Sequence, residues 1–235
     1  MNKLIGISGL AGDGKDSLCN MFRQLFEERG YEFERIALAD SIKEECKDAL
    51  LSLYGIDPII CSREDKSKIR DFLVFHGKVK RIETKGTHWT GKISKIISQF
   101  PKTKNDRIVC IPDIRHAEYE NDEVYWLKKN GGILIHVKKY EIESAYPFKK
   151  IFSIPVNNEE ATHTPKVEAL ADYVLEWQDT SPKPPEESHF SKQSVYELFS
   201  LIYGPLIETK SLSKSRKTKK NIENWPKSSG TAFAF

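Results

Sequence analysis

The stretch GLAGDGKDSLC, from Gly9 to Cys19, carries the clearest chemical pattern in the sequence. Gly9 to Lys15 match G-x-x-x-x-G-K, a loop whose backbone N–H groups surround phosphates while its lysine reaches the outer phosphates. The next residue is ordinarily Ser or Thr, whose hydroxyl binds magnesium, but here it is Asp16. The pattern predicts a nucleotide phosphate site with a changed metal ligand. Its alternative is an ordinary glycine-rich turn between a strand and a helix.

The residues on either side of this loop meet the structural requirement of the pattern. Before it, Lys3–Ser8 is a short apolar run closed by glycine, which is typical of a strand buried on both faces. After it, apolar residues recur at helical spacing from Leu18 to Phe26, and Gly30 ends the predicted helix Lys15–Arg29. The order strand, loop, helix is the one that phosphate binding at a helix N-terminus requires.

The rest of the chain alternates between apolar runs of strand length and amphipathic runs of helical length. This alternation indicates an α/β fold with a parallel, five-stranded sheet flanked by helices. Because such sheets bind ligands at the carboxyl ends of their strands, the residues just after each strand should carry the chemistry. The further predicted strands are Phe33–Ala39, Arg107–Ile111, Ile133–Lys138 and Tyr173–Trp177. The further predicted helices are Ser41–Tyr54, Arg63–Lys80, Trp89–Phe100, Ala117–Asn130 and Ser191–Tyr203.

The stretch ALADSIKEE follows the second predicted strand and offers Asp40 and Lys43 as candidate substrate-binding residues. A structural interpretation is also available, because Ser41 with Glu44 forms the S-x-x-E capping box of a helix start. We adopt the capping interpretation for Ser41 and Glu44, and we keep both interpretations open for Lys43.

The stretch PDIR follows the third predicted strand and places an acid and an arginine two residues apart. Arg115 could bind an acceptor phosphate through two parallel hydrogen bonds, and Asp113 could hold a metal-bound water or orient the acceptor. The alternative is a helix-capping aspartate beside a solvated arginine. Because both residues should share a sheet edge with the phosphate loop, we favour the functional interpretation.

A long basic stretch follows the fourth predicted strand. It could close over bound phosphates as a mobile segment, and a solvated basic loop is the alternative. Its candidate residues are Lys138, Lys139, Lys149, Lys150 and His163.

Composition limits the class of protein. With 30% charged and 39% hydrophobic residues the chain is ordinary for a globular protein, and no apolar run approaches the roughly 20 residues of a membrane span. The formal net charge of +3 comes from Thr209 to Phe235, which hold six Lys, one Arg and one Glu. We therefore expect 209–235 to be a basic, disordered tail on a net acidic body. The cysteines lack the C-x-x-C spacing of a zinc site and should be reduced thiols of a cytoplasmic protein: Cys19, Cys46, Cys61 and Cys110.

Several short motifs occur in one order between Lys3 and Trp177. They are G-x-x-x-x-G-K-D-S, LADSIK, R-x-F-L-x-x-x-G from Arg70 to Gly77, PDIR, GGILIHVKK and a histidine ahead of DYVLEW. In this order they resemble the phage-type deoxynucleoside monophosphate kinases, a family with G-K-D-T where most phosphate loops have G-K-S or G-K-T. The resemblance makes Asp16 a family mark, with Ser17 in place of the threonine. Animal-type phosphomevalonate kinases share the fold, the G-K-D loop and a D-x-R after the third strand, and they are the runner-up.

The resemblance implies a fold and a set of site residues. The fold is the three-layer P-loop nucleoside monophosphate kinase type over 1–208, with an acceptor-binding helical region at about 40–100 and a lid-like segment at about 139–166. ATP and Mg²⁺ are expected at Gly9, Gly12, Gly14, Lys15, Asp16 and Ser17, the last two as metal ligands. The resemblance places Arg70, Asp113 and Arg115 in the acceptor and transfer site, where Asp40 and Lys43 join them as candidates by their position after the second strand, and Lys15 is expected to act in phosphoryl transfer. Two departures leave the acceptor open, because Trp177-Gln178 stands where the family usually has Asn and Lys78-Val79 where it often has Thr-Asp.

Together these features predict an ATP-dependent kinase that converts a deoxynucleoside monophosphate to the diphosphate. The alternatives are a phosphomevalonate kinase, a kinase that acts on nucleic acid and uses the basic tail, and a nucleotide-binding switch without catalysis. We expect a cytoplasmic protein that binds a small-molecule substrate and no membrane, with nucleic acid only by way of the tail. A homodimer is left open.

Overall fold

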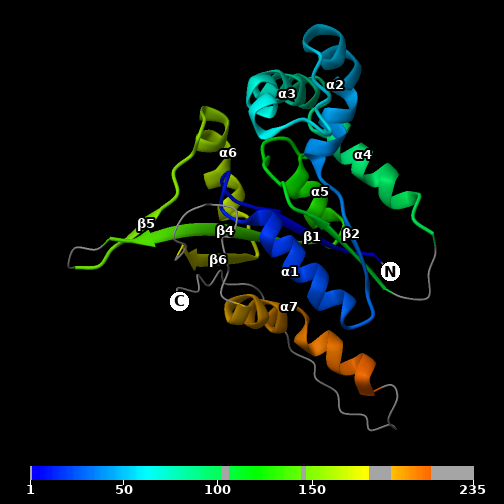
Figure 1. Ribbon diagram of the computed structural model, residues 1–235. Coiled ribbons are helices and arrows are strands. Elements are labelled where there is room, and N and C mark those ends of the chain that lie inside the picture. Colours follow the sequence, from blue (N-terminus) through cyan, green and yellow to red (C-terminus); the bar gives the residue numbers. More distant parts are fainter. Residues whose placement is uncertain (1, 102–105, 144–146, 180–191, 213–235) are drawn as a thin grey trace.

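The computed structural model describes residues 2–101, 106–143, 147–179 and 192–212, and its centre is a six-stranded sheet (Figure 1). Five strands run parallel, in the order β2 (Glu32–Arg35), β3 (Arg107–Ile111), β1 (Asn2–Ser8), β4 (Ile133–Ile142) and β6 (Tyr173–Gln178). The predicted α/β fold with five parallel strands is confirmed. A short sixth strand, β5 (Lys150–Phe152), pairs antiparallel with the end of β4 and makes the sheet mixed.

The central strands are apolar on both faces, which explains why helices cover both sides of the sheet. In β1, Leu4 belongs to one hydrophobic core, whereas Ile5 and Ile7 belong to the other. The same alternation separates Val109 from Ile108 in β3, as the period of two along a strand requires.

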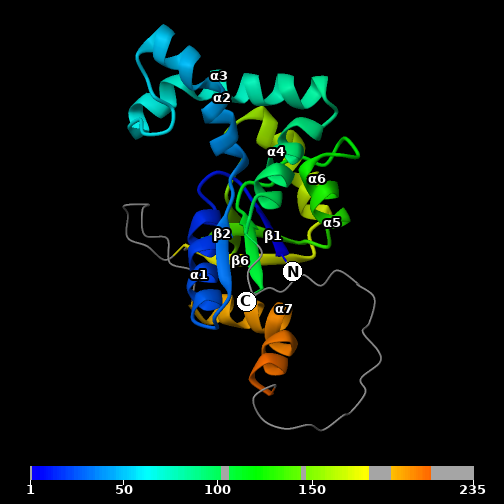
Figure 2. The ribbon, with the colours of Figure 1, turned by 90° about the vertical axis from the view of Figure 1, so that its right-hand side faces the viewer.

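Two sets of helices complete these cores (Figures 1 and 2). On the face of Ile5, α1 (Lys15–Glu27) and α7 (Lys192–Leu212) supply an aromatic cluster in which Phe26 and Phe199 lie with their ring centroids 4.9 Å apart. The opposite core receives residues of α4 (Thr87–Ser98), α5 (Glu123–Lys129) and α6 (Asn158–Ala169). The result is a three-layer arrangement.

The pair α2 (Leu38–Tyr54) and α3 (Arg63–Glu83) stands above the sheet (Figure 2). It has a small core of its own, formed by Cys46, Leu50 and Ile69. This pair, together with α4, makes up the helical region that the sequence predicts at about 40–100.

The boundary between β2 and α2 differs from the prediction, and the difference places Arg35 at the cavity. β2 ends at Arg35 and α2 already begins at Leu38. Ser41 therefore lies inside the helix, so the capping box that we predicted with Glu44 is wrong. The start of α2 is instead held by a carboxylate from another strand, Asp113.

The predicted helix Ala117–Asn130 begins only at Glu123. Before it, the carboxylate of Asp122 accepts hydrogen bonds from the backbone N–H of Glu118 (2.8 Å) and Tyr119 (2.9 Å). Such side-chain bonds give the backbone an alternative to helix, so residues 117–122 form a turn.

The C-terminal part contains more regular structure than the prediction allows. The lid-like segment at about 139–166 includes the end of β4, β5 and most of α6. α7 continues to Leu212, inside the predicted tail, and 213–235 lie outside the described residues. The four cysteines are free thiols, as predicted. None of the helices in the described ranges combines the length and apolarity that crossing a membrane would require.

Candidate active site

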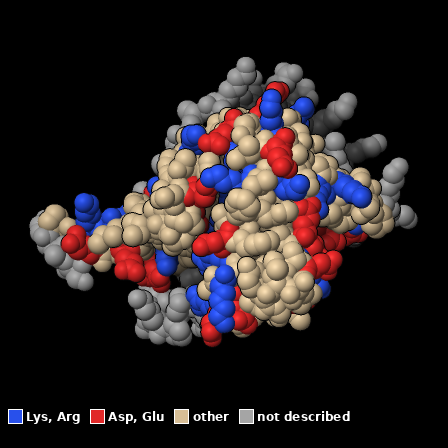
Figure 3. All heavy atoms as spheres, turned by 90° about the horizontal axis from the view of Figure 1, so that it is seen from above, with Lys and Arg blue, Asp and Glu red and all other residues tan. Residues whose placement is uncertain are grey.

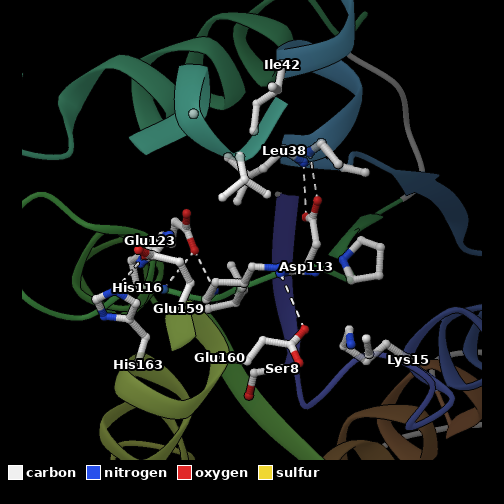
Figure 4. Close-up of a pocket in the computed structure, with 18 of the residues that line it drawn as sticks. Ser8, Lys15, Leu38, Ile42, Asp113, His116, Glu123, Glu159, Glu160 and His163 are labelled. Carbon is white, nitrogen blue, oxygen red and sulfur yellow. Dashed lines mark hydrogen bonds and ion pairs between the residues drawn. The ribbon is translucent and has the colours of Figure 1, made fainter. Parts of the chain in front are cut away.

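A cavity of about 480 Å³ opens beside the phosphate loop, between the α2–α3 pair and α6 (Figure 4). It brings together residues from widely separated parts of the sequence. The predicted site residues that line it are Gly9, Gly12, Lys15, Asp16, Asp40, Lys43, Arg70, Asp113 and Arg115. Gly14 and Ser17 belong to the same loop and the first turn of α1, but they do not line the cavity.

The loop between β1 and α1 has positive φ angles, which favour glycine, at three positions: Gly9, Gly12 and Gly14. Gly9 has φ 145°, and a Cβ there would lie 2.5 Å from the carbonyl oxygen of Val137. Gly14 has φ 87° and is the N-cap residue of α1. These glycines let the chain turn tightly into the helix, whose N-terminal N–H groups then form a site suited to phosphate.

Lys15 closes the hollow of this loop. Its Nζ donates hydrogen bonds to the carbonyl oxygens of Gly9 (2.9 Å) and Leu10 (2.6 Å). Burial lowers the pKa of Lys15, and the nearby positive charge of Arg115 lowers it further. A partly desolvated ammonium in a glycine loop fits the predicted ATP phosphate site.

A hydrogen bond from Trp177 of β6 stabilises the loop. The indole Nε1 of Trp177 donates to the carbonyl oxygen of Asp13 (2.8 Å), and Asp13 Oδ2 accepts from the backbone N–H of Leu10 (3.1 Å). Trp177 is thus one of the positions where the sequence departs from the family it resembles, and here it supports the loop.

Asp16 forms an ion pair that the sequence analysis did not foresee. Its Oδ1 lies 3.0 Å from Nη2 of Arg35, and Nη1 of Arg35 lies 3.2 Å from Oδ2 of Asp40. Asp40 also accepts from Lys43 at 2.9 Å. Arg35 was overlooked because it lies inside the predicted strand Phe33–Ala39, whereas the observed strand ends there and leaves Arg35 on the cavity wall.

Several carboxylates line the cavity, among them those of Asp16, Asp40 and Asp113. No group of three or more His, Cys, Asp or Glu side chains within the described parts of the chain is arranged to hold a metal ion. Proteins commonly bind Mg²⁺ through one or two carboxylates together with water and substrate phosphates. Asp16, whose side chain is 74% exposed beside the loop, can serve as such a carboxylate, whereas Ser17 is not placed on the cavity wall.

Asp113 supports α2 (Figure 4). Its two carboxylate oxygens accept from the backbone N–H groups of Leu38 (3.0 Å) and Ala39 (2.8 Å). Burial raises the pKa of Asp113, and these two hydrogen bonds oppose the rise. The structure therefore gives Asp113 a capping role at the start of α2, and the role that we predicted for it in phosphoryl transfer stays a prediction.

The capping role makes a testable prediction. Asp113→Ala should lower the free energy of unfolding by about 1–2 kcal/mol, the usual cost of losing a helix N-cap. Urea denaturation followed by circular dichroism measures the loss. Asp113→Asn retains one acceptor oxygen and should cost less. An alanine variant as stable as wild type but inactive would show that Asp113 acts on substrate and not on the helix.

Arg115 stands on a turn that a buried acid organises. Glu123 Oε2 accepts from the backbone N–H groups of Arg115 (2.5 Å) and His116 (3.0 Å), and Glu123 is only 6% exposed. The Arg115 guanidinium points into the cavity, where Nη1 lies 3.6 Å from Oε1 of Glu160. Glu123 is not among the predicted site residues, because the pattern of this stretch predicts the middle of the helix Ala117–Asn130.

Glu123 should make stability depend on pH. Burial raises its pKa from 4.5 to about 8 in the folded protein. Between these values the folded state holds the proton and the unfolded state does not, so stability falls as pH rises from about 5 to about 8. Glu123→Gln should remove this part of the fall, because glutamine does not ionise. Urea midpoints of both proteins at several pH values test it, and parallel curves would contradict it.

The first turn of α6 borders the cavity with two acids (Figure 4). Glu160 is 6% exposed, and its Oε1 lies 3.6 Å from Nη1 of Arg115. Glu159 forms an ion pair of 2.6 Å with Lys78 of α3. Through these contacts α6, at the end of the predicted lid-like segment, bridges the helical region and the core of the protein.

The wall opposite the loop is apolar. Ile42 of α2 lines it together with Leu73, Val74 and Gly77 of α3. A Cβ on Gly77 would lie 3.1 Å from Cδ1 of Ile42, so this glycine lets Ile42 pack closely against α3. The indole of Trp89 donates to the carbonyl oxygen of Gly77 (2.9 Å) and holds α4 against this wall.

Charges of both signs surround the site. The face of the protein seen from above carries Lys and Arg interspersed with Asp and Glu among its described residues (Figure 3). Arg70 and Lys66, one helical turn apart on α3, line the outer part of the cavity. The arrangement suits an anionic small molecule held by several separate cations.

Comparisons with known proteins yield structural likenesses alone. No family model matches the sequence, and no curated protein matches it. Among solved structures, an APS kinase of Mycobacterium tuberculosis is 13% identical with a TM-score of 0.36, covering 86% of this chain and 96% of its own. A shikimate kinase of Acinetobacter baumannii in complex with shikimate is 13% identical with a TM-score of 0.41, covering 87% and 95%. A gluconokinase of Sinorhizobium meliloti is 12% identical with a TM-score of 0.33, covering 86% and 97%. At such identities and TM-scores, these likenesses carry no argument about the activity of this chain.

Proposed function

We propose that this protein is an ATP-dependent kinase that phosphorylates a deoxynucleoside monophosphate to the diphosphate. One observation carries the proposal: Lys15 fills the hollow of a glycine loop at a helix N-terminus, and the guanidinium of Arg115 lines the same cavity nearby. Each cation can hold one phosphate. A cavity with two such cations is suited to bringing a donor and an acceptor phosphate together.

Phosphoryl transfer needs positioning and neutralised charge more than covalent help from the protein. On the donor side, the loop N–H groups and Lys15 would bind the ATP phosphates. Asp16, with Ser17 as the second predicted ligand, would hold magnesium, which neutralises the charge that develops on the phosphates. On the acceptor side, Arg115, Arg70 and Lys43 would bind the monophosphate. A phosphate acceptor is already anionic near neutral pH, so no general base is required.

The apolar wall supports an acceptor that carries a flat ring. Ile42, Leu73 and Val74 offer carbon surface without charge, and Gly77 lets Ile42 pack closely against α3. A nucleobase could lie against this wall while its 5′-phosphate reaches the cations. This combination favours a nucleotide over phosphomevalonate, which has no flat ring to occupy the wall.

An assay against several acceptors tests the proposal. Purified full-length protein with Mg²⁺ and ATP should release ADP with at least one of dAMP, dCMP, dGMP and dTMP, and the product should be the diphosphate. Mevalonate 5-phosphate and single-stranded DNA serve as alternative acceptors. Transfer to mevalonate 5-phosphate alone would establish the runner-up, and ATP binding without transfer to any acceptor would favour a nucleotide-binding switch.

The basic C-terminal segment favours a second candidate, a kinase that acts on nucleic acid, because its lysines could contact a phosphate backbone. We predict that deleting 213–235 leaves kinase activity on monophosphates within about twofold of wild type, since a segment so poor in apolar residues cannot bury much surface. Steady-state rates of the two proteins measure this. A collapse of activity, or loss of single-stranded DNA as an acceptor, would support the nucleic-acid candidate.

The proposal includes a cytoplasmic location and a small-molecule substrate as the principal partner. A homodimer is compatible with it, and sedimentation analysis of the purified protein would decide the oligomeric state.

A further inference from the structure

Arg35 joins the two sides of the proposed active site. It is the last residue of β2, and its side chain is 31% exposed on the cavity wall. One nitrogen lies 3.0 Å from Asp16 in the first turn of α1, beside the phosphate loop. Another lies 3.2 Å from Asp40 in the first turn of α2, beside the acceptor region.

Both acids that pair with Arg35 are exposed, and the Asp40 side chain is 53% exposed. The Asp16 side chain is 74% exposed, so its ion pair with Arg35 is screened by water and readily exchanged. Asp40 is shared between Arg35 and Lys43, which lies 2.9 Å away. The two carboxylates therefore hold the Arg35 guanidinium beside the cavity, where it stays accessible to solvent.

We propose that Arg35 is a further phosphate-binding residue of the acceptor side, held back by Asp16 while the phosphate loop is empty. This inference rests on the proposed function. When ATP binds with Mg²⁺, the Asp16 carboxylate would pair with that ion instead of with Arg35. The Arg35 guanidinium would then be free to bind the acceptor phosphate through two parallel N–H groups. Donor and acceptor should then strengthen each other's binding, and the effect is reciprocal.

The proposal predicts opposite effects for the two partners of one ion pair. Asp16→Asn removes the charge that holds Arg35 back, so a deoxynucleoside monophosphate should bind this variant several-fold more tightly than wild type when ATP is absent. Arg35→Gln should bind the monophosphate on the order of tenfold more weakly, and its affinity should not respond to a donor, because the coupling needs the guanidinium. A purely structural role for the pair would shift both variants in the same direction.

Titration calorimetry on the full-length protein tests whether the two variants change the affinity for the monophosphate in opposite directions. Each protein is titrated with the best of the four deoxynucleoside monophosphates, alone and with Mg²⁺ and a non-hydrolysable ATP analogue. Arg29→Gln is the matched control, because its side chain is 32% exposed but lies outside the cavity at the end of α1. It should behave as wild type. Arg35→Lys keeps the charge but lacks the planar fork, and should fall between wild type and Arg35→Gln; it also serves if the glutamine variant does not fold.

The possible failures are distinguishable. If wild type phosphorylates a monophosphate and Arg35→Gln matches Arg29→Gln in affinity and in coupling, the role of Arg35 is rejected and the proposed function stands. If Asp16→Asn binds the monophosphate more weakly than wild type, Asp16 does not hold Arg35 back. If wild type neither binds nor phosphorylates any of the four monophosphates, the proposed function fails and the inference falls with it.

Discussion

Replacing Lys15 with alanine should lower the turnover number by on the order of 10³-fold, about 4 kcal/mol in the barrier, while the protein stays folded. The Lys15 ammonium donates hydrogen bonds to two carbonyl oxygens of its own loop, those of Gly9 and Leu10. A bound triphosphate would offer stronger, negatively charged acceptors in the same hollow. The loss should therefore appear in catalysis and in ATP affinity, and only weakly in stability.

Steady-state kinetics with ATP and the preferred monophosphate measure the effect of Lys15→Ala. Lys47→Ala is a suitable control, because Lys47 is 37% exposed and pairs with Asp57 away from the cavity. Its turnover should be unchanged. Turnover of Lys15→Ala within about tenfold of wild type, a barrier change of about 1.4 kcal/mol, would show that the loop is only a glycine-rich turn.

Asp122→Ala should have the largest effect on stability, about 3–5 kcal/mol, because it leaves a buried guanidinium without its main partner. Arg81 is 4% exposed and Asp122 is 1% exposed. Nε and Nη2 of Arg81 each lie 2.9 Å from a different oxygen of Asp122, and Glu118 accepts from Nη2 at 2.7 Å. Asp122 also organises the turn before α5, so its removal loosens the backbone as well.

Urea denaturation of Asp122→Ala against wild type measures this cost. Lys68→Ala is the control, because Lys68 pairs with Asp65 on the exposed side of α3 and such pairs contribute little. If Asp122→Ala lowers the free energy of unfolding by less than about 1 kcal/mol, water or Glu118 compensates the charge of Arg81 well. Because Arg81 lies near the end of α3, a large loss of stability would also indicate that the Arg81–Asp122 pair holds the apolar wall of the cavity in place above the sheet.

Much of the fold follows from local pattern. The strand Arg107–Ile111 has the predicted bounds because its residues are apolar on both faces. The helix after Lys15 follows from the spacing of Leu18, Phe22 and Phe26, which bury one face. The phosphate loop could be read from sequence because its glycines and its lysine lie in one continuous stretch.

The errors have a common cause in contacts between distant residues. The capping box at Ser41 was locally plausible, but Asp113, far along the chain, caps α2 three residues earlier. The predicted helix from Ala117 was plausible by composition, but Asp122 and the distant Arg81 hold a turn there instead. Local propensity is a weak term that such tertiary contacts override.

By itself the sequence predicted the glycine-rich loop before α1, the alternation of parallel strands with helices, and the candidate site residues Lys15, Asp113 and Arg115, because each depends on residues close together in the chain. The tertiary structure alone decided that Arg35 neutralises Asp16 and that Glu123 holds the turn of Arg115. Both are charge interactions of a few ångströms between different elements. Coulomb attraction depends on distance in space and on burial, and neither quantity can be read from spacing along a chain.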